Sequence, residues 1–86
     1  MNTVVFPGSF DPITNGHLDL ISRASYLAER VIVAVAINTS KNPFFDLQER
    51  CKLVTEATKD IKGVVVIPFE GLLAEFAKTH QAQALI

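Results

Sequence analysis

Short apolar runs without a polar break most constrain what this sequence can fold into. Residues 31–37 are seven consecutive apolar residues, and residues 64–67 form a similar run of Val and Ile. Runs this short and this rich in β-branched residues are typical of strands that are covered on both faces, as in a parallel sheet. A further run begins at Val4 and is stopped by a Pro-Gly pair, and residues 84–86 resemble the start of another strand. The sequence therefore predicts four strands.

The intervals between these runs carry helical patterns. Apolar and small residues recur at helical spacing from Leu18 onward, and Thr14 or Asn15 precedes them as a candidate N-cap. Asp46 begins a capping-box pattern in front of a second helix. The residues that this second helix is expected to bury are Leu47, Cys51, Val54 and Ala57. Pro68 is expected to stop the third strand. The residues that mark a third helix after it are Leu72, Leu73, Phe76, Ala77 and His80.

The elements alternate in the order β-α-β-α-β-α-β, which predicts an α/β fold with a Rossmann-like, doubly wound parallel sheet. The twist of the strands makes the crossover connections right-handed. A chain of 86 residues is expected to form one domain. Because no helix follows residues 84–86 to cover the fourth strand, we interpret residues 1–86 as the N-terminal part of a single domain, truncated after that strand.

Charge and cysteine content exclude several classes of function. Eight Lys and Arg residues against nine Asp and Glu residues give a net charge of -1. This balance argues against nucleic-acid or membrane binding driven by charge. No apolar run approaches the roughly 20 residues that a membrane helix needs. The single cysteine, Cys51, excludes a disulfide within the chain and a cysteine-based metal site, and it fits a reduced, cytoplasmic setting.

Residues 7–17, here called the 7–17 loop, read Pro-Gly-Ser-Phe-Asp-Pro-Ile-Thr-Asn-Gly-His. The loop follows the first strand, and ligands of open parallel sheets bind beyond the carboxyl ends of the strands. Its glycines allow close backbone approach, Ser9 and Thr14 offer hydroxyl groups, and the N-terminus of the next helix attracts anions. His17 lies in the first turn of that helix, where it can donate a hydrogen bond to a phosphate oxygen.

Taken singly, the residues of the 7–17 loop have plainer interpretations. Glycine and proline after a strand usually form only a turn, and a lone histidine in a first helical turn is usually a surface residue. The sequence also lacks both the G-x-G-x-x-G and the G-x-x-x-x-G-K-[ST] patterns. From its residue types alone, the loop predicts phosphate handling at a helix N-terminus and nothing finer.

The combination of residues is more specific. Thr14-x-Gly16-His17 after a strand resembles the [T/H]-x-G-H signature of the nucleotidyltransferase superfamily, and the whole 7–17 loop is similar to that of the bacterial phosphopantetheine adenylyltransferase family. Further stretches resemble the same family, namely Ser40-Lys41-Asn42-Pro43-x-Phe45, Leu47-x-Glu49-Arg50 and Phe69-Glu70-Gly71-Leu72-Leu73. The resemblance therefore runs over the full length of the sequence.

This resemblance implies transfer of the adenylyl group of ATP to 4'-phosphopantetheine, which gives dephospho-coenzyme A and pyrophosphate. It implies Mg²⁺ as a cofactor, ATP and 4'-phosphopantetheine as the bound small molecules, and assembly into hexamers. His17 would be the transition-state stabiliser, and Ser9, Phe10 and His17 would contact ATP. Ser9, Lys41 and Leu73 would contact phosphopantetheine, and no residue of this chain would ligate a metal. Most members of the family have Thr at the position of Ser9, so this residue departs mildly from the pattern.

Other assignments remain open. Because the family continues into an arginine-bearing loop and a later ATP-binding motif that this chain lacks, the chain alone is expected to be inactive. A nucleotidyltransferase with another phosphate acceptor, and a non-catalytic α/β binding or assembly fragment, are the main alternatives. A flavodoxin-like receiver would need an acidic cluster, which Asp11 alone does not provide. Asp11 is expected to brace its turn, and Glu49 and Arg50 are expected to serve helix capping or packing.

Overall fold

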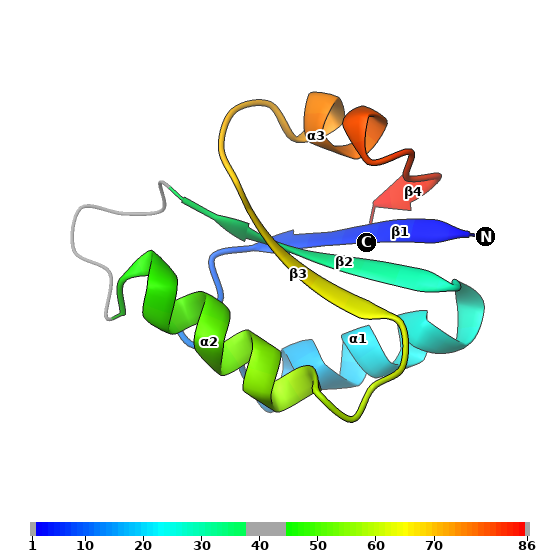
Figure 1. The fold of residues 1–86 in the computed structure, drawn as a ribbon. Coiled ribbons are helices and arrows are strands. Elements are labelled where there is room, and N and C mark those ends of the chain that lie inside the picture. Colours follow the sequence, from blue (N-terminus) through cyan, green and yellow to red (C-terminus); the bar gives the residue numbers. More distant parts are fainter. Residues whose placement is uncertain (1, 38–44, 86) are drawn as a thin grey trace.

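A computed structural model describes residues 2–37 and 45–85. The alternation of strands and helices predicted from the sequence is confirmed (Figure 1). The elements, in chain order, are β1 (Thr3–Gly8), α1 (Asn15–Leu27), β2 (Arg30–Ala36), α2 (Leu47–Thr58), β3 (Val64–Phe69), α3 (Leu73–Thr79) and β4 (Ala84–Leu85). Within the described residues, no helix is long and apolar enough to cross a membrane.

The four strands form one parallel sheet with the order β3-β2-β1-β4. Figure 1 shows α1 and α2 on one face of this sheet and α3 on the other. The chain thus winds outward from β1 to β3 on one face, and then crosses back over the other face to place β4 beside β1. The strand order reverses between β1 and β4, which is the point where doubly wound sheets bind ligands. The predicted fold class is confirmed.

Each face of the sheet has its own hydrophobic cluster. On the α1 and α2 side, alternate residues of β1 and β2 pack with Ile21 and Val54. On the α3 side, Val5, Ile32 and Ala34 pack with partly buried residues of β3 and α3. Because side chains alternate between the faces of a strand, all five residues of β2 from Val31 to Val35 are fully buried. Burial on both faces therefore explains the apolar run over residues 31–35, whereas Ile37 at its end is 36% exposed.

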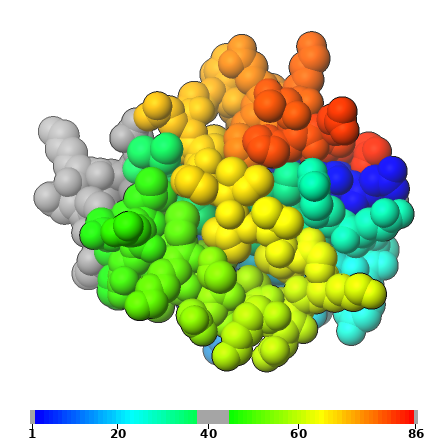
Figure 2. Space-filling view, viewed as in Figure 1, coloured from blue at the N-terminus to red at the C-terminus, as the bar shows by residue number. Residues whose placement is uncertain are grey.

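The prediction that Pro68 ends the third strand is wrong, since β3 continues to Phe69. The carbonyl oxygen of Phe69 accepts a hydrogen bond of 2.9 Å from the backbone N–H of Ile37, so the polar groups of Phe69 face β2. Because successive residues of a strand alternate in direction, the backbone polar groups of the preceding residue, Pro68, face away from β2. The missing N–H of Pro68 therefore removes no hydrogen bond from the sheet. This outward orientation is possible because β3 is an edge strand, and Figure 2 shows its residues across the centre of one molecular face.

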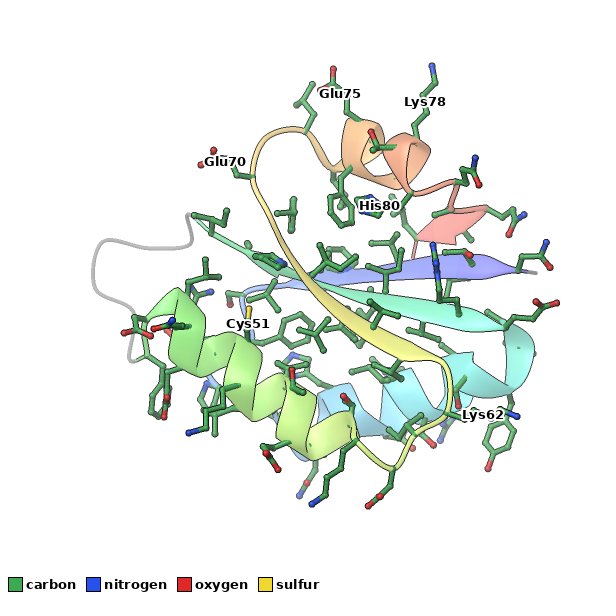
Figure 3. The ribbon with its side chains drawn as sticks, in the orientation of Figure 1. Cys51, Lys62, Glu70, Glu75, Lys78 and His80 are labelled. Atoms are coloured by element: carbon green, nitrogen blue, oxygen red, sulfur yellow. The ribbon has the colours of Figure 1, made fainter. Side chains whose placement is uncertain are left out.

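The second helix is rotated slightly from the predicted orientation. Asp46 is its N-cap, as predicted, and accepts the N–H of Glu49 at 2.8 Å. The expected core residues Leu47, Cys51 and Val54 all pack against the cluster on this face, and Figure 3 shows Cys51 on the side of α2 that faces the sheet. The expectation that Ala57 is buried is wrong, because Ala57 is exposed and the next residue, Thr58, is buried in its place. The fully buried stripe of α2 consists of Arg50, Val54 and Thr58.

Two adjacent residues of α1 offer a matched test of this packing. Ile21 is 0% exposed and lies in the cluster between α1 and the sheet, whereas Leu20 is 47% exposed. We expect Ile21→Ala to lower the free energy of unfolding by about 2–5 kcal/mol, because it leaves a cavity in the core. Leu20→Ala should change it by about 0.5 kcal/mol or less. Urea unfolding followed by circular dichroism measures both values, and equal losses would contradict the described orientation of α1.

Candidate functional site

The 7–17 loop leaves β1 at Gly8 and enters α1 at Asn15, at the carboxyl ends of the strands. The first backbone N–H groups of a helix have no acceptor within the helix, so those of Asn15 and Gly16 are available to an anion. The N-terminal end of α1 also carries a partial positive charge. No acidic residue lies in the first turn of α1 to neutralise that charge. The start of α1 therefore offers free N–H groups and a partial positive charge to an anion.

Thr14 and His17 form a reciprocal capping box at the start of α1. The hydroxyl oxygen of Thr14 accepts the N–H of His17 at 3.3 Å, and Nδ1 of His17 accepts the N–H of Thr14 at 3.0 Å. Nδ1 also lies 3.0 Å from the Thr14 hydroxyl oxygen. Because Nδ1 acts as an acceptor, the neutral imidazole carries its proton on Nε2. The helix cap thus fixes the tautomer of His17 and leaves Nε2–H as a donor.

Two aromatic rings hold the plane of this imidazole. The ring of Phe10 lies 4.9 Å from that of His17 between centroids, and the ring of Phe6 lies 6.1 Å away, both in edge-type arrangements. Phe6 and Phe10 also pack against each other at 5.7 Å. With Nδ1 held by the backbone and the ring held by its neighbours, Nε2 has little freedom to change direction. A donor with a fixed direction is what electrostatic stabilisation of a developing charge requires.

Phe10 contributes to this arrangement through its side chain, which is buried with 1% exposure. Its backbone has φ of 50°, in the left-handed region, and its ring folds back over Gly8. A Cβ atom at Gly8 would lie 3.0 Å from the Phe10 ring, so a larger residue here would require the ring to shift. Since the ring is buried among Phe6, Gly8 and His17, the predicted contact of Phe10 with ATP would have to use its backbone.

Ser9 has the opposite character, because its side chain is exposed. Its hydroxyl has no hydrogen-bond partner among the described residues, while its carbonyl oxygen accepts a hydrogen bond of 3.0 Å from Nη1 of Arg50. The structure therefore holds the backbone of Ser9 in place and leaves its hydroxyl available to a ligand. This arrangement is compatible with the predicted contacts of Ser9 with both substrates, which remain predictions.

Arg50 is expected to serve capping or packing, and the structure shows a packing role that is more specific. The residue is buried, with 2% exposure, and its guanidinium joins three segments. Nη1 donates to the carbonyl oxygens of Ser9 and Ala36, at 3.0 and 2.8 Å, and Nε donates to that of Phe45 at 3.1 Å. The sequence carries a signal only for the burial of Arg50, since Arg50, Val54 and Thr58 recur every four residues and so share one helix face.

Asp11 links the same two loops. Its carboxylate accepts the backbone N–H of Phe45 at 2.8 Å, so it braces the 7–17 loop against the segment that leads into α2. The peptide bond between Asp11 and Pro12 is cis. The expectation that Asp11 serves the loop structure agrees with this contact, although the partner lies 34 residues further along the chain.

The structure gives less information about Lys41 and Leu73, the two remaining residues of the expected phosphopantetheine site. Lys41 lies outside the described residues. Leu73 begins α3 and packs against the hydrophobic cluster on that face of the sheet, while Leu72, which precedes it, is 67% exposed. Figure 3 shows His80 on the side of α3 that faces the sheet and Glu75 and Lys78 pointing outward. The contact of Leu73 with phosphopantetheine stays a prediction.

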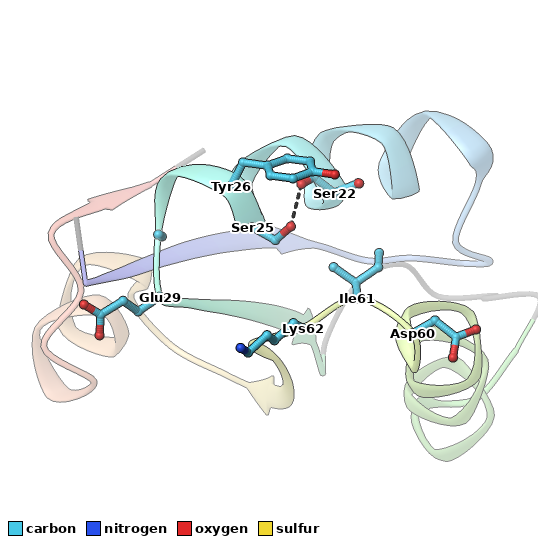
Figure 4. Close-up of a pocket in the computed structure, with 8 residues that line it drawn as sticks. Ser22, Ser25, Tyr26, Glu29, Asp60, Ile61 and Lys62 are labelled. Carbon is cyan, nitrogen blue, oxygen red and sulfur yellow. Dashed lines mark hydrogen bonds between the residues drawn. The ribbon is translucent and has the colours of Figure 1, made fainter.

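The described residues contain no group of three or more His, Cys, Asp or Glu side chains that could hold a metal ion. A hollow of about 540 Å³ does exist elsewhere, between the end of α1 and the turn that precedes β3 (Figure 4). Its lining residues are Ser22, Ser25, Tyr26, Ala28, Glu29, Asp60, Ile61 and Lys62. Because this hollow lies at the amino ends of β2 and β3, it is at the opposite edge of the sheet from the 7–17 loop and is no part of the candidate site.

Comparison with proteins of known sequence gives close relatives. The chain is 69% identical over 86 residues to a phosphopantetheine adenylyltransferase from Psychromonas ingrahamii. This match covers 100% of the chain and 53% of the relative. It is 51% identical over 82 residues to a phosphopantetheine adenylyltransferase from Helicobacter pylori, covering 95% of this chain and 52% of the relative. The chain thus spans about half the length of the curated relatives that it matches.

Comparison with solved structures gives the same fold. A bifunctional NMN adenylyltransferase/ADP ribose pyrophosphatase from Francisella tularensis, solved with AMP and a manganese ion, superposes with a TM-score of 0.68 at 27% identity. The match covers 90% of this chain and 25% of that one. A nicotinic acid mononucleotide adenylyltransferase from Plasmodium falciparum, solved with NaAD, superposes with a TM-score of 0.69 at 17% identity, over 96% of this chain and 48% of that one.

The family described as cytidylyltransferase-like matches residues 5–86, which include most of β1, the 7–17 loop and every later element of the structure. The expected nucleotidyltransferase resemblance is confirmed by this match. The chain belongs to the cytidylyltransferase-like family.

Proposed function

We propose that this chain carries the phosphate-handling half of a phosphopantetheine adenylyltransferase site, which transfers the adenylyl group of ATP to 4'-phosphopantetheine. The observation that supports this most is the fixed Nε2–H donor of His17 at the N-terminal end of α1, close in sequence to the exposed hydroxyl of Ser9. The identity of 69% to a relative of that name supports the choice of reaction. Dephospho-coenzyme A and pyrophosphate would be the products.

The chemistry needs positioning and charge stabilisation from the protein. A phosphate oxygen of phosphopantetheine forms a bond to the α-phosphorus of ATP, and the bond from that phosphorus to the pyrophosphate leaving group breaks. Negative charge on the α-phosphate oxygens would be stabilised by Nε2–H of His17 and by the free N–H groups at the start of α1. No protein nucleophile is required, because the attacking group is the substrate's own phosphate.

Ser9, Lys41 and Leu73 are proposed to hold phosphopantetheine, and Ser9 and Phe10 join His17 in contacting ATP. Mg²⁺ is the proposed cofactor, and when bound it neutralises part of the phosphate charge. Mg²⁺ in enzymes that act on nucleotides is usually bound by one or two carboxylates together with the substrate phosphates. A hexamer in the cytoplasm is proposed for the assembled enzyme.

A second acceptor calls for a direct test. Two proteins with the same fold act, by their names, on pyridine mononucleotides, namely NMN and nicotinic acid mononucleotide. If this chain shared their acceptor, the reaction type and the role of His17 would be unchanged, and only the contacts to the acceptor beyond its phosphate would differ. The resemblance of residues 69–73 to the phosphopantetheine family favours phosphopantetheine.

A chimaera tests the reaction with the residues of this chain. Residues 1–86 replace the matching part of the Psychromonas ingrahamii relative, and pyrophosphate release is measured with ATP, Mg²⁺ and either phosphopantetheine or nicotinate mononucleotide. We expect turnover with phosphopantetheine alone. His17→Ala should lower kcat by about 10²–10³, because it removes a donor to the transition state.

His80→Ala is the matched control for this experiment, since it removes the other histidine of the chain, at the end of α3. It should leave kcat near that of the unsubstituted chimaera. Turnover with nicotinate mononucleotide would shift the assignment to the second acceptor. Turnover that survives His17→Ala undiminished would contradict the proposed mechanism.

The capping box generates a separate prediction about Thr14. Thr14→Val keeps the side-chain shape but removes the oxygen that accepts the His17 N–H, so we expect a loss of about 1 kcal/mol in the free energy of unfolding. Thr14→Ser keeps an oxygen and should lose less. Long-range ¹H–¹⁵N spectra of the unsubstituted chain should show that the neutral form of His17 carries its proton on Nε2. A proton on Nδ1 would show that Nδ1 is not the acceptor described here.

A further inference from the structure

The backbone ladder between β1 and β2 ends one step before the guanidinium of Arg50. The last paired residues of the two strands are Gly8 and Val35. One residue further along each strand, the carbonyl oxygens of Ser9 and Ala36 accept hydrogen bonds from the same nitrogen, Nη1 of Arg50. Arg50 therefore takes the place of the next rung of the ladder and links the two strands where they separate.

The guanidinium also ties this point to α2. Its Nε donates to the carbonyl oxygen of Phe45, which lies just before the N-cap residue Asp46. Three carbonyl groups from separate segments thus converge on one side chain that is 2% exposed. Because the guanidinium is planar and rigid, the positions of these three carbonyls are fixed relative to one another. The backbone of Ser9 is held by a group that belongs to neither the loop nor β1.

Among the described residues, Arg50 forms no ion pair with a carboxylate, and the carboxylate of Asp11 at the same junction is held on the N–H of Phe45. The two ion pairs between described residues, Asp19–Arg23 and Glu56–Lys59, lie on exposed helix surfaces elsewhere. Carbonyl dipoles satisfy hydrogen bonds but do not cancel a net charge, and a buried cation that forms no ion pair acts on its surroundings with little screening. Burial raises the pKa of the neighbouring Cys51 thiol, and the charge of Arg50 lowers it in part.

We propose that Arg50 is a positioning residue of the phosphate site, which fixes the backbone of Ser9 and supplies a buried positive charge beneath the 7–17 loop. This inference rests on the proposed function, because it takes phosphate groups to be the ligands of that loop. An anionic phosphate bound over Ser9 would be attracted by this charge, which no ion pair of the described residues neutralises. Arg50 would therefore act on the ligand through the loop and through its field, without touching the reacting atoms.

Three variants of the 86-residue chain separate charge from geometry. Arg50→Met removes both the charge and the hydrogen bonds, whereas Arg50→Lys keeps the charge and loses the planar fork. Lys52→Met is the matched control, because it removes the same charge from an exposed position on the same helix. Inorganic pyrophosphate is the probe. Its binding is measured from shifts of the backbone amide signals of the 7–17 loop in ¹H–¹⁵N spectra, and circular dichroism checks the folding of each variant.

We expect Arg50→Met to weaken pyrophosphate binding by about tenfold, and Arg50→Lys to weaken it by a smaller factor. Lys52→Met should change it by about twofold or less, since an exposed charge is screened. The amide signal of Ser9 should move in both Arg50 variants before any ligand is added, and it should stay in place in Lys52→Met.

The outcomes distinguish this inference from the proposed function. If pyrophosphate does not shift the loop signals of the unsubstituted chain, the 7–17 loop is not a phosphate site and the proposed function fails together with the inference. If the unsubstituted chain binds and folded Arg50 variants bind equally well, Arg50 is only structural and the inference alone is overturned. If Arg50→Met does not fold, Arg50→Lys decides, and binding equal to that of the unsubstituted chain overturns the positioning role.

Discussion

The parallel pairing of β1 with β2 on one side and β4 on the other determines most of the architecture of this molecule. A strand that is paired on both sides and covered on both faces must be largely apolar, as residues 4–6 of β1 and 31–36 of β2 are. The same pairing requires crossover connections that pass over opposite faces of the sheet. It therefore fixes where α1, α2 and α3 can pack, and it brings the loop after β1 to the point where the strand order reverses.

The capping of α1 shows how one set of contacts can serve both folding and chemistry. A capping box usually uses a Glu or Gln side chain to accept the N–H of the cap residue. Here the imidazole of His17 does so, and its second nitrogen remains available to a ligand. The stability of the helix start and the orientation of the donor are therefore coupled. A substitution at Thr14 would act on the site even though Thr14 itself need not touch a substrate.

Sequence patterns predict the sheet well because burial on two faces leaves a strong signal in strands such as residues 31–37. They fail where the deciding contact lies outside the local sequence. Pro68 does not end its strand, because β3 lies at the edge of the sheet and the position of the missing N–H faces away from β2. The position of β3 in the sheet cannot be derived from the residues around Pro68. The clamp formed by Arg50 is not predictable locally, because its acceptors include Ser9 and Ala36, which only the folded chain brings together. The burial of the Phe10 ring is not predictable locally either, because the ring packs against Phe6 and His17 from a residue with a left-handed backbone.

Pro68 affects whether other chains can add a strand to the free edge of the sheet at β3. The free edge of a sheet is a template on which a foreign strand can add, and this is a common route to aggregation. On the outer side of β3, the position of Pro68 offers no N–H to an incoming strand, and the strand is only six residues long. A register of regular hydrogen bonds cannot continue past that point. The proline thus opposes the addition of a further strand at this edge of the sheet. The edge strand can therefore be strongly apolar with a smaller tendency to aggregate.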